Sequence, residues 1–537
     1  MKVIVIGAVA GGPSFATRLR RLNENIDILM IERGSDISYA SCALPYYLGD
    51  VITDVDTIIE RTPTVLKNKN NIDVLVRHEV TSIDSKLKQV TVKNLITNES
   101  FTEKYDVLVI STGTRAILPP IKGVDQVNNS FILRNVNDAN KIKDYITAEQ
   151  PKTATIIGAG VAGLEIAENL EDRGIAVTIV DQLAEVAYPY DHEIATIIND
   201  ELVRNHVKLF LNQKISEIQD AGRKLILTDG SKLTTDMLIF ATGVTPNSEL
   251  AKEAGIQLSR DQHIVVNERL ETSVANVYAI GDVIETKSYI TGLATPSMLS
   301  SAANRQGHLL ADIISGNPLT YRGFIGAGVA KIFDLTASFV GYTEHMLAVA
   351  GISNYKTIFI TPFDHAYFYP SASRLNLKII FEENTGKILG GQAVGENGVD
   401  KRIGELSVAI TGNLTIFDLP DLELPYSPPY STTRDPLNTA GYVAINQISN
   451  TANTIKLTEI PENDLTTAFF LDIREADASP AGSLKASKNI PLSKLRQRID
   501  EIPTDRKVYI TFRKGLSPYN AARILAGKEI KAVLIQE

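Results

Sequence analysis

The chain has 537 residues, enough for roughly three or four domains, and its composition is ordinary for a globular protein. Its net charge of −9 excludes the basic surface typical of nucleic-acid-binding proteins. No apolar stretch approaches the roughly 18 residues of a membrane span. One cysteine and no secretion signal predict a cytoplasmic protein.

The first predicted unit is a strand, a glycine-rich loop and a helix at the N-terminus. Strand 2–6 runs into the loop at residues 7–12, a helix follows over residues 14–22, and the next strand ends at Glu32. Such glycines let the backbone approach a pyrophosphate, and the acid binds ribose hydroxyls. Val9 occupies the place of the middle glycine, so this motif by itself also fits an ordinary crossover.

The only cysteine, Cys42, follows this unit and is preceded by Ser41. A single cysteine excludes an internal disulfide, a CxxC pair and a cysteine-rich metal site. Redox chemistry here therefore requires that the sulfur bonds to a molecule outside the chain. Pro45 predicts a short helix, which places the thiol near a helix N-terminus, where the dipole favours thiolate. The alternative is a buried core cysteine.

A second glycine loop is complete, with Gly158, Gly160 and Gly163. It predicts a helix over residues 164–173 and a strand that ends at Asp181. A carboxylate there accepts the adenosine ribose hydroxyls and repels a 2′-phosphate. No Arg or Lys follows closely to bind that phosphate, so the sequence favours NADH over NADPH.

Three further strands end in short motifs. Thr112-Gly113 and Thr242-Gly243 flank the second glycine loop, and Gly281-Asp282 follows later. The Asp282 carboxylate can accept a ribityl hydroxyl of a flavin. This order is typical of flavoprotein reductases that bind FAD in an outer domain and NAD(P)H in an inserted one.

On these motifs, with the segments at residues 41–47 and 424–436, residues 1 to about 445 resemble the flavin disulfide reductases, specifically the single-cysteine coenzyme A–disulfide reductase branch. The resemblance implies an α/β protein with two Rossmann-like dinucleotide-binding domains, as in glutathione reductase, and an α+β dimerisation domain. The implied domains are FAD-binding (1–118 and 247–322), NAD(P)H-binding (119–246) and dimerisation (323–446).

The resemblance also implies roles for individual residues. Cys42 is the implied redox centre, and Tyr426 is the implied proton donor, reaching the partner subunit's flavin; Tyr430, Tyr367 and Tyr369 are the alternatives, because Phe368 replaces a family tyrosine. Packing at a dimer interface is the other interpretation of these tyrosines. The implied FAD set is Gly7, Ala10, Gly11, Gly12, Glu32, Arg33, Ser41, Val80, Thr112, Gly113, Gly281, Asp282 and Tyr426.

Two further sets complete the expected site. The implied NAD set is Gly158, Gly160, Val161, Gly163, Asp181 and Gly243. The implied coenzyme A set is Ser14, Arg18, Arg21, Ser38, Ser41, Lys67, Lys69 and Asn304, with both lysines in the loop before strand 72–76. Each of these is also an ordinary surface residue, and no metal site is expected.

The tail, residues 455–537, resembles a rhodanese domain of α/β type and follows a predicted linker at 447–454. Phe512 stands where a working rhodanese carries its sulfur-accepting cysteine, so sulfur transfer by this domain is excluded. Arg513 and Lys514 could attract an anion, although a solvated loop is the plainer interpretation.

Together these features predict an FAD-dependent NAD(P)H oxidoreductase that reduces coenzyme A persulfide, coenzyme A disulfide or related polysulfides through Cys42. It is expected to be a homodimer, with coenzyme A as substrate or as a mixed disulfide. One alternative is an NADH oxidase or peroxidase, although such enzymes carry a histidine where this chain has Ala10. The other is a flavin-binding redox-sensing scaffold whose tail is a docking module.

Overall fold

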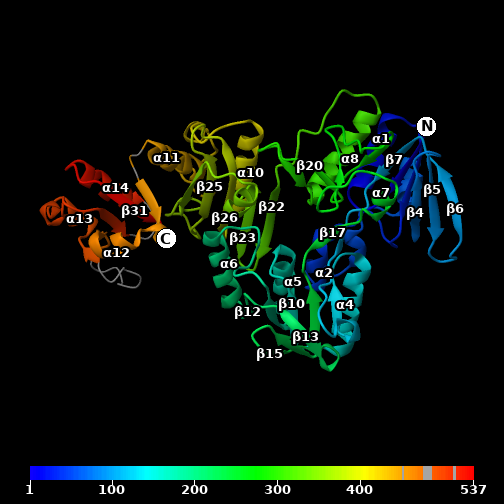
Figure 1. The fold of residues 1–537 in the computed structure, drawn as a ribbon, viewed down its shortest axis with the longest axis horizontal. Coiled ribbons are helices and arrows are strands. Elements are labelled where there is room, and N and C mark those ends of the chain that lie inside the picture. The colour runs from blue at the N-terminus through cyan, green and yellow to red at the C-terminus, as the bar shows by residue number, and fades with distance from the viewer. Residues whose placement is uncertain (450, 452, 476–486, 512–515, 537) are drawn as a thin grey trace. The chain divides into compact units, whose positions relative to one another are not determined.

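The computed structural model describes residues 1–449, 451, 453–475, 487–511 and 516–536 (Figure 1). The chain forms two compact units, Met1–Asp334 and Leu335–Glu537, and each is described separately. Within the described residues, no helix is both long enough and apolar enough to cross a lipid bilayer.

The first unit contains a five-stranded parallel sheet in the order β19-β7-β1-β2-β3. These strands are β1 (Lys2–Ile6), β2 (Asp27–Glu32), β3 (Asp73–Val76), β7 (Val107–Ile110) and β19 (Val277–Ala279). Apart from Lys2, the central strand β1 and its neighbour β7 are apolar, because helices cover parallel sheets on both faces. Helices α1 (Gly11–Leu22) and α8 (Ser300–Ile314) pack closely, since a Cβ on Gly307 would lie 2.5 Å from the Gly11 carbonyl oxygen.

A second parallel sheet in the same unit has the order β12-β11-β10-β16-β9. Its strands are β9 (Ser130–Ile132), β10 (Thr153–Ile157), β11 (Ala176–Val180), β12 (Lys208–Phe210) and β16 (Met237–Phe240). Its helices are α4 (Val136–Glu149), α5 (Val161–Glu171) and α6 (His192–Arg204). Counted from its β9 edge, the second sheet repeats the strand arrangement of the first. The edge strands differ in chain position, because β9 precedes the second glycine loop whereas β19 comes long after the first glycine loop.

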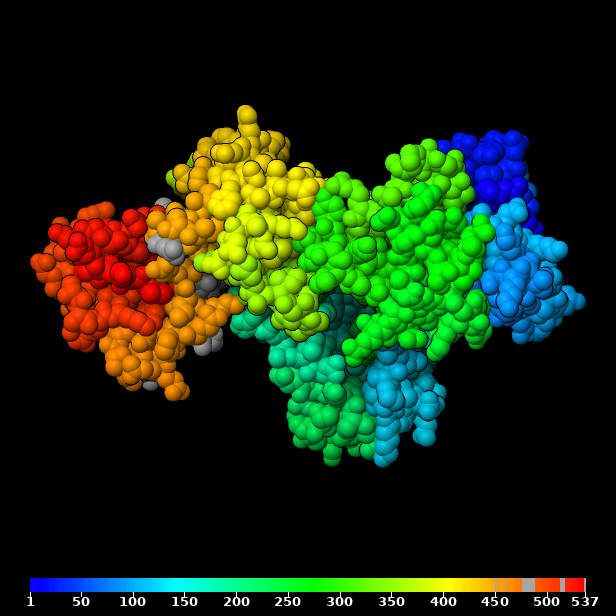
Figure 2. Space-filling view, turned by 45° about the horizontal axis from the view of Figure 1, so that its top comes forward, coloured from blue at the N-terminus to red at the C-terminus, as the bar shows by residue number. Residues whose placement is uncertain are grey.

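Each parallel sheet is accompanied by a three-stranded antiparallel sheet, β4-β5-β6 or β13-β14-β15. Figure 2 shows the first of these, over residues 78–104, at the surface beside the N-terminal segment. The strands are β4 (His78–Asp84), β5 (Gln89–Asn94), β6 (Ser100–Lys104), β13 (Ile215–Gln219), β14 (Lys224–Leu227) and β15 (Lys232–Thr234). The remaining elements are β8 (Thr114–Ala116), which pairs with β17 (Val244–Pro246), then α7 (Glu249–Glu253), β18 (Ile264–Val265), β20 (Ile284–Lys287), β21 (Ala294–Pro296) and β22 (Ala327–Ile332).

The segment that carries Cys42 is held by residues of the second nucleotide-binding fold. A short 3₁₀ turn, Ser41–Ala43, leads into helix α2 (Leu44–Leu48), as Pro45 predicts. The Tyr47 hydroxyl lies 3.1 Å from Asn140 Oδ1 on α4, and Arg173 donates to the Leu48 carbonyl oxygen at 2.8 Å. Helix α2 therefore lies against α4 and α5, the helices on either side of strand β10.

The second unit begins with an antiparallel sheet in which β23, β26, β25 and β24 are adjacent in that order. Its elements are β23 (Leu335–Gly341), α9 (Glu344–Val349), β24 (Tyr355–Ile360), β25 (Asn376–Glu382), β26 (Ile388–Gly395), α10 (Val399–Thr411) and α11 (Pro436–Ile448). The α+β arrangement expected for a dimerisation domain is present.

The tail forms a third parallel sheet, in the order β27-β31-β30-β28-β29. Its elements are β27 (Asn453–Lys456), α12 (Glu462–Thr467), β28 (Phe469–Asp472), β29 (Ser487–Asn489), α13 (Leu492–Leu495), β30 (Val508–Thr511), α14 (Leu516–Ala526) and β31 (Ala532–Gln536). Helix α11 continues to Ile448 and β27 begins at Asn453, so this interval is shorter than the predicted linker. Phe512, Arg513 and Lys514 lie outside the described residues.

The structure confirms the α/β fold and corrects several predicted boundaries. Helices α1 and α5 begin three residues earlier than predicted, at Gly11 and Val161, because each helix starts within its glycine loop. The lysines Lys67 and Lys69 lie in helix α3 (Pro63–Asn70), not in a loop. That helix forms because Thr62 caps it and a proline occupies its first turn.

Candidate active site

A cavity of about 550 Å³ joins the motifs that the sequence assigns to FAD. Of the predicted set it is lined by Gly7, Ala10, Gly11, Glu32, Arg33, Ser41, Thr112, Gly113, Gly281 and Asp282. The glycine loop, the first Thr-Gly motif and the Gly-Asp motif thus meet in one place. Ser41 brings the cavity to the residue beside Cys42. A long dinucleotide with a flavin at one end fits this lining.

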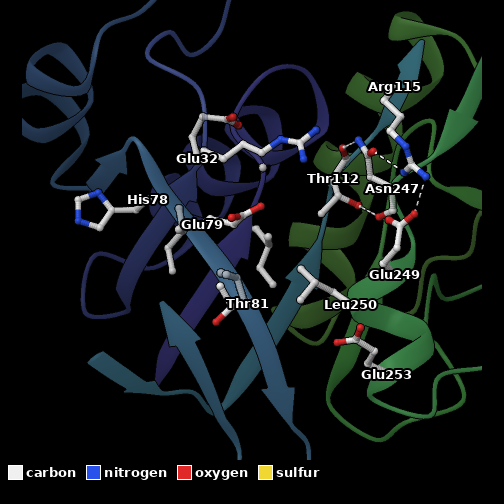
Figure 3. A pocket seen from close by; sticks show the side chains of 15 residues that line it. Glu32, His78, Glu79, Thr81, Thr112, Arg115, Asn247, Glu249, Leu250 and Glu253 are labelled. Carbon is white, nitrogen blue, oxygen red and sulfur yellow. Dashed lines mark hydrogen bonds and ion pairs between the residues drawn. The ribbon is translucent and has the colours of Figure 1, made fainter. Parts of the chain in front are cut away.

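A second cavity, of about 470 Å³, shares Gly7, Glu32 and Arg33 with the first and extends to Val80. Figure 3 shows Arg115, Asn247 and Glu249 on one side and the β4 residues on the other. Arg115 pairs with Glu249 at 2.6 Å. This end suits the adenosine part of the cofactor, because Glu32, the acid predicted to bind ribose, lies here.

The carboxylates at the two strand ends are held in the same way. Glu32 Oε2 accepts the Ala8 N–H at 2.9 Å, and Oε1 accepts the Gly34 N–H at 2.8 Å. Asp181 Oδ2 accepts the Ala159 N–H at 2.6 Å, and Oδ1 accepts the Leu183 N–H at 2.8 Å. Each acid is thereby fixed beside its glycine loop, at the position where it would bind a ribose.

The predicted NAD residues lie together on the β10–α5 loop and the adjacent strand end. The peptide at Gly158 has φ +109°, and a Cβ there would lie 2.3 Å from the Ala241 carbonyl oxygen. A Cβ on Gly160, in contrast, would meet no atom of the described residues within 4 Å. The missing side chain at Gly160 therefore leaves space that the protein itself does not use, as expected for a pyrophosphate. Gly163, Val161 and Gly243 complete this loop cluster.

Asp282, predicted to bind the flavin ribityl chain, has a partner that sequence reasoning missed. Arg134 Nη2 lies 3.3 Å from Asp282 Oδ2 and donates to the Thr114 hydroxyl at 2.7 Å. Burial raises the pKa of Asp282, and Arg134 opposes that shift. Arg134 also lines the larger cavity. No local motif marks it, because it comes from the inserted domain.

Cys42 is exposed, and its surroundings contain two titratable groups that sequence reasoning also missed. Burial, followed by the carboxylates of Glu165 and Glu168, raises the pKa of Tyr46 to about 12; the Cys42 sulfur contributes in the same direction. Burial and then Glu168 raise the pKa of Glu165 to about 7. Glu168 itself is buried and pairs with Lys331. The exposed sulfur argues against the core-cysteine interpretation.

The predicted coenzyme A residues fall into two groups. The Ser14 hydroxyl donates to the Asn304 carbonyl oxygen at 2.8 Å, so these two residues are brought together. Arg18 is held by Asp312 at 2.7 Å, and Lys67 by Asp73 at 2.8 Å. These two cations are therefore already neutralised by carboxylates.

Other members of that set differ in access. Ser38 is buried and has φ +49°, whereas Ser41 lines the cofactor cavity. Arg21 and Lys69 are exposed and make no ion pair with any described residue. Arg305, one residue after Asn304 on α8, is likewise exposed and was missed, although its neighbour was predicted.

The predicted catalytic tyrosines lie on two loops of the second unit. The 364 loop (residues 361–375) joins β24 to β25 and carries Tyr367 and Tyr369; the 426 loop (residues 422–435) precedes α11 and carries Tyr426 and Tyr430. The four side chains are exposed by 74, 43, 46 and 72%, respectively. The Ala366 N–H donates to the Pro428 carbonyl oxygen at 3.2 Å, so the loops are adjacent.

Comparison with known proteins gives consistent results. Residues 1–307 match the family described as pyridine nucleotide-disulphide oxidoreductase, and residues 329–436 match its dimerisation domain. A coenzyme A disulfide reductase of Staphylococcus epidermidis is 35% identical over 448 residues, covering 82% of this chain and 99% of that protein.

Two solved structures match nearly the whole chain. Reduced Bacillus anthracis CoADR-RHD aligns with a TM-score of 0.98 at 42% identity, covering 99% of this chain and 96% of that one. An NAD-dependent persulfide reductase from A. fulgidus aligns with a TM-score of 0.93 at 33% identity, covering 100% and 99%.

Proposed function

The chain belongs to the pyridine nucleotide-disulphide oxidoreductase family, and we propose that it is an FAD-dependent NAD(P)H oxidoreductase that reduces coenzyme A disulfide, coenzyme A persulfide or related small persulfides and polysulfides. The observation that carries this proposal is the exposed Cys42, the only cysteine in the chain, beside a cavity lined by the FAD motifs.

The proposed chemistry begins at sulfur. The Cys42 thiolate attacks an external S–S bond, forms a mixed disulfide and releases one thiolate, which takes a proton from a tyrosine, Tyr426 by preference. Bound FAD would supply the redox chemistry that links NADH to this sulfur. The overall reaction consumes one NADH and one proton for each S–S bond. A disulfide yields two thiols, and a persulfide yields one thiol and hydrogen sulfide.

We propose that Asp181 makes NADH the preferred reductant. Its carboxylate is fixed at the loop by the Ala159 and Leu183 N–H groups, and a 2′-phosphate there would meet its negative charge. Ser14, Arg21, Lys69 and Asn304 are proposed to bind the phosphates and pantetheine of coenzyme A, with Arg305 as an additional cation. Arg18, Lys67 and Ser38 take part only if their present contacts rearrange.

We also propose a homodimer. The 364 and 426 loops expose Phe368 and four tyrosines, and both loops belong to the segment that matches the dimerisation domain. Exposed apolar side chains gathered in one place are typical of a protein–protein interface. A second copy is the proposed cover, and the tyrosines are proposed to complete the partner's site.

The alternatives fit less well. An NADH oxidase or peroxidase would be expected to carry a histidine where Ala10 stands, and the 35% relative over 82% of the chain is a coenzyme A disulfide reductase. The exposed Cys42 together with the two nucleotide loops argues against a flavin-binding redox-sensing scaffold, because reduction of an S–S substrate by NADH requires all three.

The test is NADH consumption by the holoenzyme with coenzyme A disulfide, coenzyme A persulfide, inorganic polysulfide and oxygen as separate acceptors. Turnover with the coenzyme A compounds well above the oxygen rate is expected. Cys42→Ser should retain FAD, still be bleached by NADH without air, and lose S–S turnover by about 1,000-fold or more. Equal rates for both proteins would place the reduction outside Cys42.

For the tail we propose a rhodanese-like domain without sulfur-transfer activity, since Cys42 is the chain's only cysteine and Phe512 stands in the loop. Thiosulfate:cyanide sulfurtransferase activity should be absent from the full chain. Measurable activity that survives in Cys42→Ser would contradict this.

A further inference from the structure

A buried arginine lies between the two loops that carry the exposed tyrosines. Arg402, on α10, is only 1% exposed. Its Nη2 donates to the Asp364 carbonyl oxygen at 2.9 Å, to Ser431 Oγ at 3.1 Å and to Asp435 Oδ2 at 3.0 Å. Asp364 belongs to the 364 loop, and Ser431 and Asp435 belong to the 426 loop. A single guanidinium nitrogen therefore bonds to both loops.

The acceptors around Arg402 are themselves fixed. Ser431 Oγ donates to Asp435 Oδ2 at 2.7 Å, and the other oxygen of Asp435 caps α11 by accepting the Leu437 N–H at 3.0 Å. Arg402 Nη1 donates back to the Gly398 carbonyl oxygen at 3.2 Å. The arginine is thus anchored to the start of its own helix and to the start of the next.

The 364 loop is closed around the residue that Arg402 contacts. Asp364 Oδ1 accepts the Ser373 N–H at 3.0 Å, and the Asp364 N–H donates to the Ser373 carbonyl oxygen at 3.1 Å. His365 lies with Nδ1 3.0 Å from Asp364 Oδ1 and Nε2 3.2 Å from the Pro370 carbonyl oxygen. A displacement of Asp364 therefore moves the segment that carries Tyr367 and Tyr369.

Stability alone does not account for this arrangement. Removing an ion pair from water costs about as much as the pairing returns, and Arg402 Nε has no partner among the described residues. The contacts instead fix the relative positions of the two loops. A planar guanidinium donates to several acceptors in fixed directions, whereas the three donors of a lysine ammonium rotate on a flexible stem.

We propose that Arg402 is a positioning residue that sets the 364 and 426 loops in one fixed arrangement, and that reduction of the S–S substrate depends on this arrangement. The proposal rests on the proposed function, since the tyrosines on these loops are its candidate proton donors. Arg402 contacts neither substrate nor cofactor and acts only through the loops.

The first measurement is amide hydrogen exchange in the full-length holoenzyme. Arg402→Lys should speed exchange about fivefold or more in peptides from both loops while strands β25 and β26 keep their wild-type protection. Ser431→Ala retains the Arg402–Asp435 pair, so it should loosen only the 426 loop. Lys401→Gln is the matched control, because Lys401 is the preceding residue on α10 and approaches Asp435 only to 3.8 Å.

The second measurement separates the two half-reactions. Arg402→Lys should slow S–S turnover about tenfold or more, since small misplacements of reacting groups are costly, and leave the rate of flavin bleaching by NADH within about twofold. Ser431→Ala should show a smaller loss of the same kind, and Lys401→Gln none. If Arg402→Lys does not fold, the exchange and turnover measurements on Ser431→Ala test the proposal without it.

The proposal is overturned if amide exchange stays at the wild-type rate in the 426 loop of Ser431→Ala or in both loops of Arg402→Lys. It is also overturned if exchange in these loops is faster but S–S turnover remains at the wild-type rate. Equal slowing of both half-reactions also overturns it, because that indicates general damage. If the wild-type enzyme reduces no coenzyme A compound, the proposed function fails, and wild-type exchange in both variants would still show separately that Arg402 does not position the loops.

Discussion

The two nucleotide-binding folds of the first unit hold their glycine loops in the same way, although the sequences of the loops differ. A Cβ on Gly7 would lie 2.1 Å from the Ser111 carbonyl oxygen, and one on Gly158 2.3 Å from that of Ala241. Both glycines have positive φ, +100° and +109°. The first position of each loop is therefore determined by backbone crowding against the neighbouring strand, which only glycine tolerates.

The folds differ at two other loop positions. Val9 stands in the first loop where the second has Gly160, whose surroundings are open. Farther on, the first helix has Ser14, bonded to Asn304, where the second has Glu165 with its raised pKa. The two folds therefore share the glycines that backbone crowding requires, and they differ at the positions that we propose to face a ligand.

The largest expected effect comes from the shared glycine. Gly7→Ala should purify without FAD, and Gly158→Ala should purify yellow but with kcat/KM for NADH at least about 100-fold lower, because the added Cβ meets a carbonyl oxygen in strained backbone. Absorbance at the flavin band and anaerobic bleaching measure the two outcomes. Gly174→Ala is the control for backbone strain alone, because Gly174 has φ +76° and its Cβ would have no neighbour within 4 Å among the described residues. Loss of FAD from Gly158→Ala would show that the two folds are not independent.

The middle position of the glycine loop, Gly160 or Val9, should distinguish an effect on folding from an effect on ligand binding. Gly160→Ala should leave Tm unchanged, since its Cβ meets no atom within 4 Å in the part of the chain that the structure describes. The same Cβ should raise KM for NADH about tenfold by crowding the pyrophosphate. Val9→Ala should change FAD retention by less than about twofold. An altered Tm with an unaltered KM would mean that Gly160 serves the fold instead.

A smaller effect is expected at the strand-end acids. Asp181→Ala should narrow the preference for NADH over NADPH about tenfold, because the charge that repels the 2′-phosphate is removed. Glu32→Ala should weaken FAD binding and leave the coenzyme preference as it was. Steady-state kinetics with both coenzymes provide the ratio, and a wild-type preference for NADPH would show this interpretation of the strand end to be wrong.

The smallest effect concerns Glu165. Its folded-state pKa of about 7 lies above the ordinary 4.5, so the folded protein retains a proton that the unfolded chain releases. Glu165 therefore lowers the free energy of unfolding progressively as the pH rises from 4.5 to about 7. Above pH 7 this destabilisation is complete and stays constant. Glu165→Gln should raise Tm at pH 8 by about 3 °C and change it little at pH 4.5. Ser14→Ala, at the matching position of the first fold, should show no such pH dependence, and a Tm gain for Glu165→Gln that is the same at both pH values would refute the assigned titration.

Much of the site could be predicted because its signals are local. A glycine loop, the helix after it and the acid at the next strand end lie within one short segment, and their spacing follows from the geometry of a strand–helix–strand unit. Cys42 could be identified with even less information, since it is the only cysteine in the sequence and Pro45 predicts the helix beside it. The family resemblance extended these signals to the domain order.

The tertiary structure decided which polar groups meet. Arg18 is neutralised by Asp312, Asp282 contacts Arg134, and Arg402 joins Asp364 to Asp435. Each partner lies far away in the chain, so no spacing rule links the two, and only the tertiary fold brings them within bonding distance. The sequence by itself determined the two glycine loops, the acids at their strand ends and the position of Cys42 beside a short helix, because these features depend on local backbone geometry. Which charges are neutralised and how the tyrosine loops are held depend on distant contacts, which only the folded chain creates.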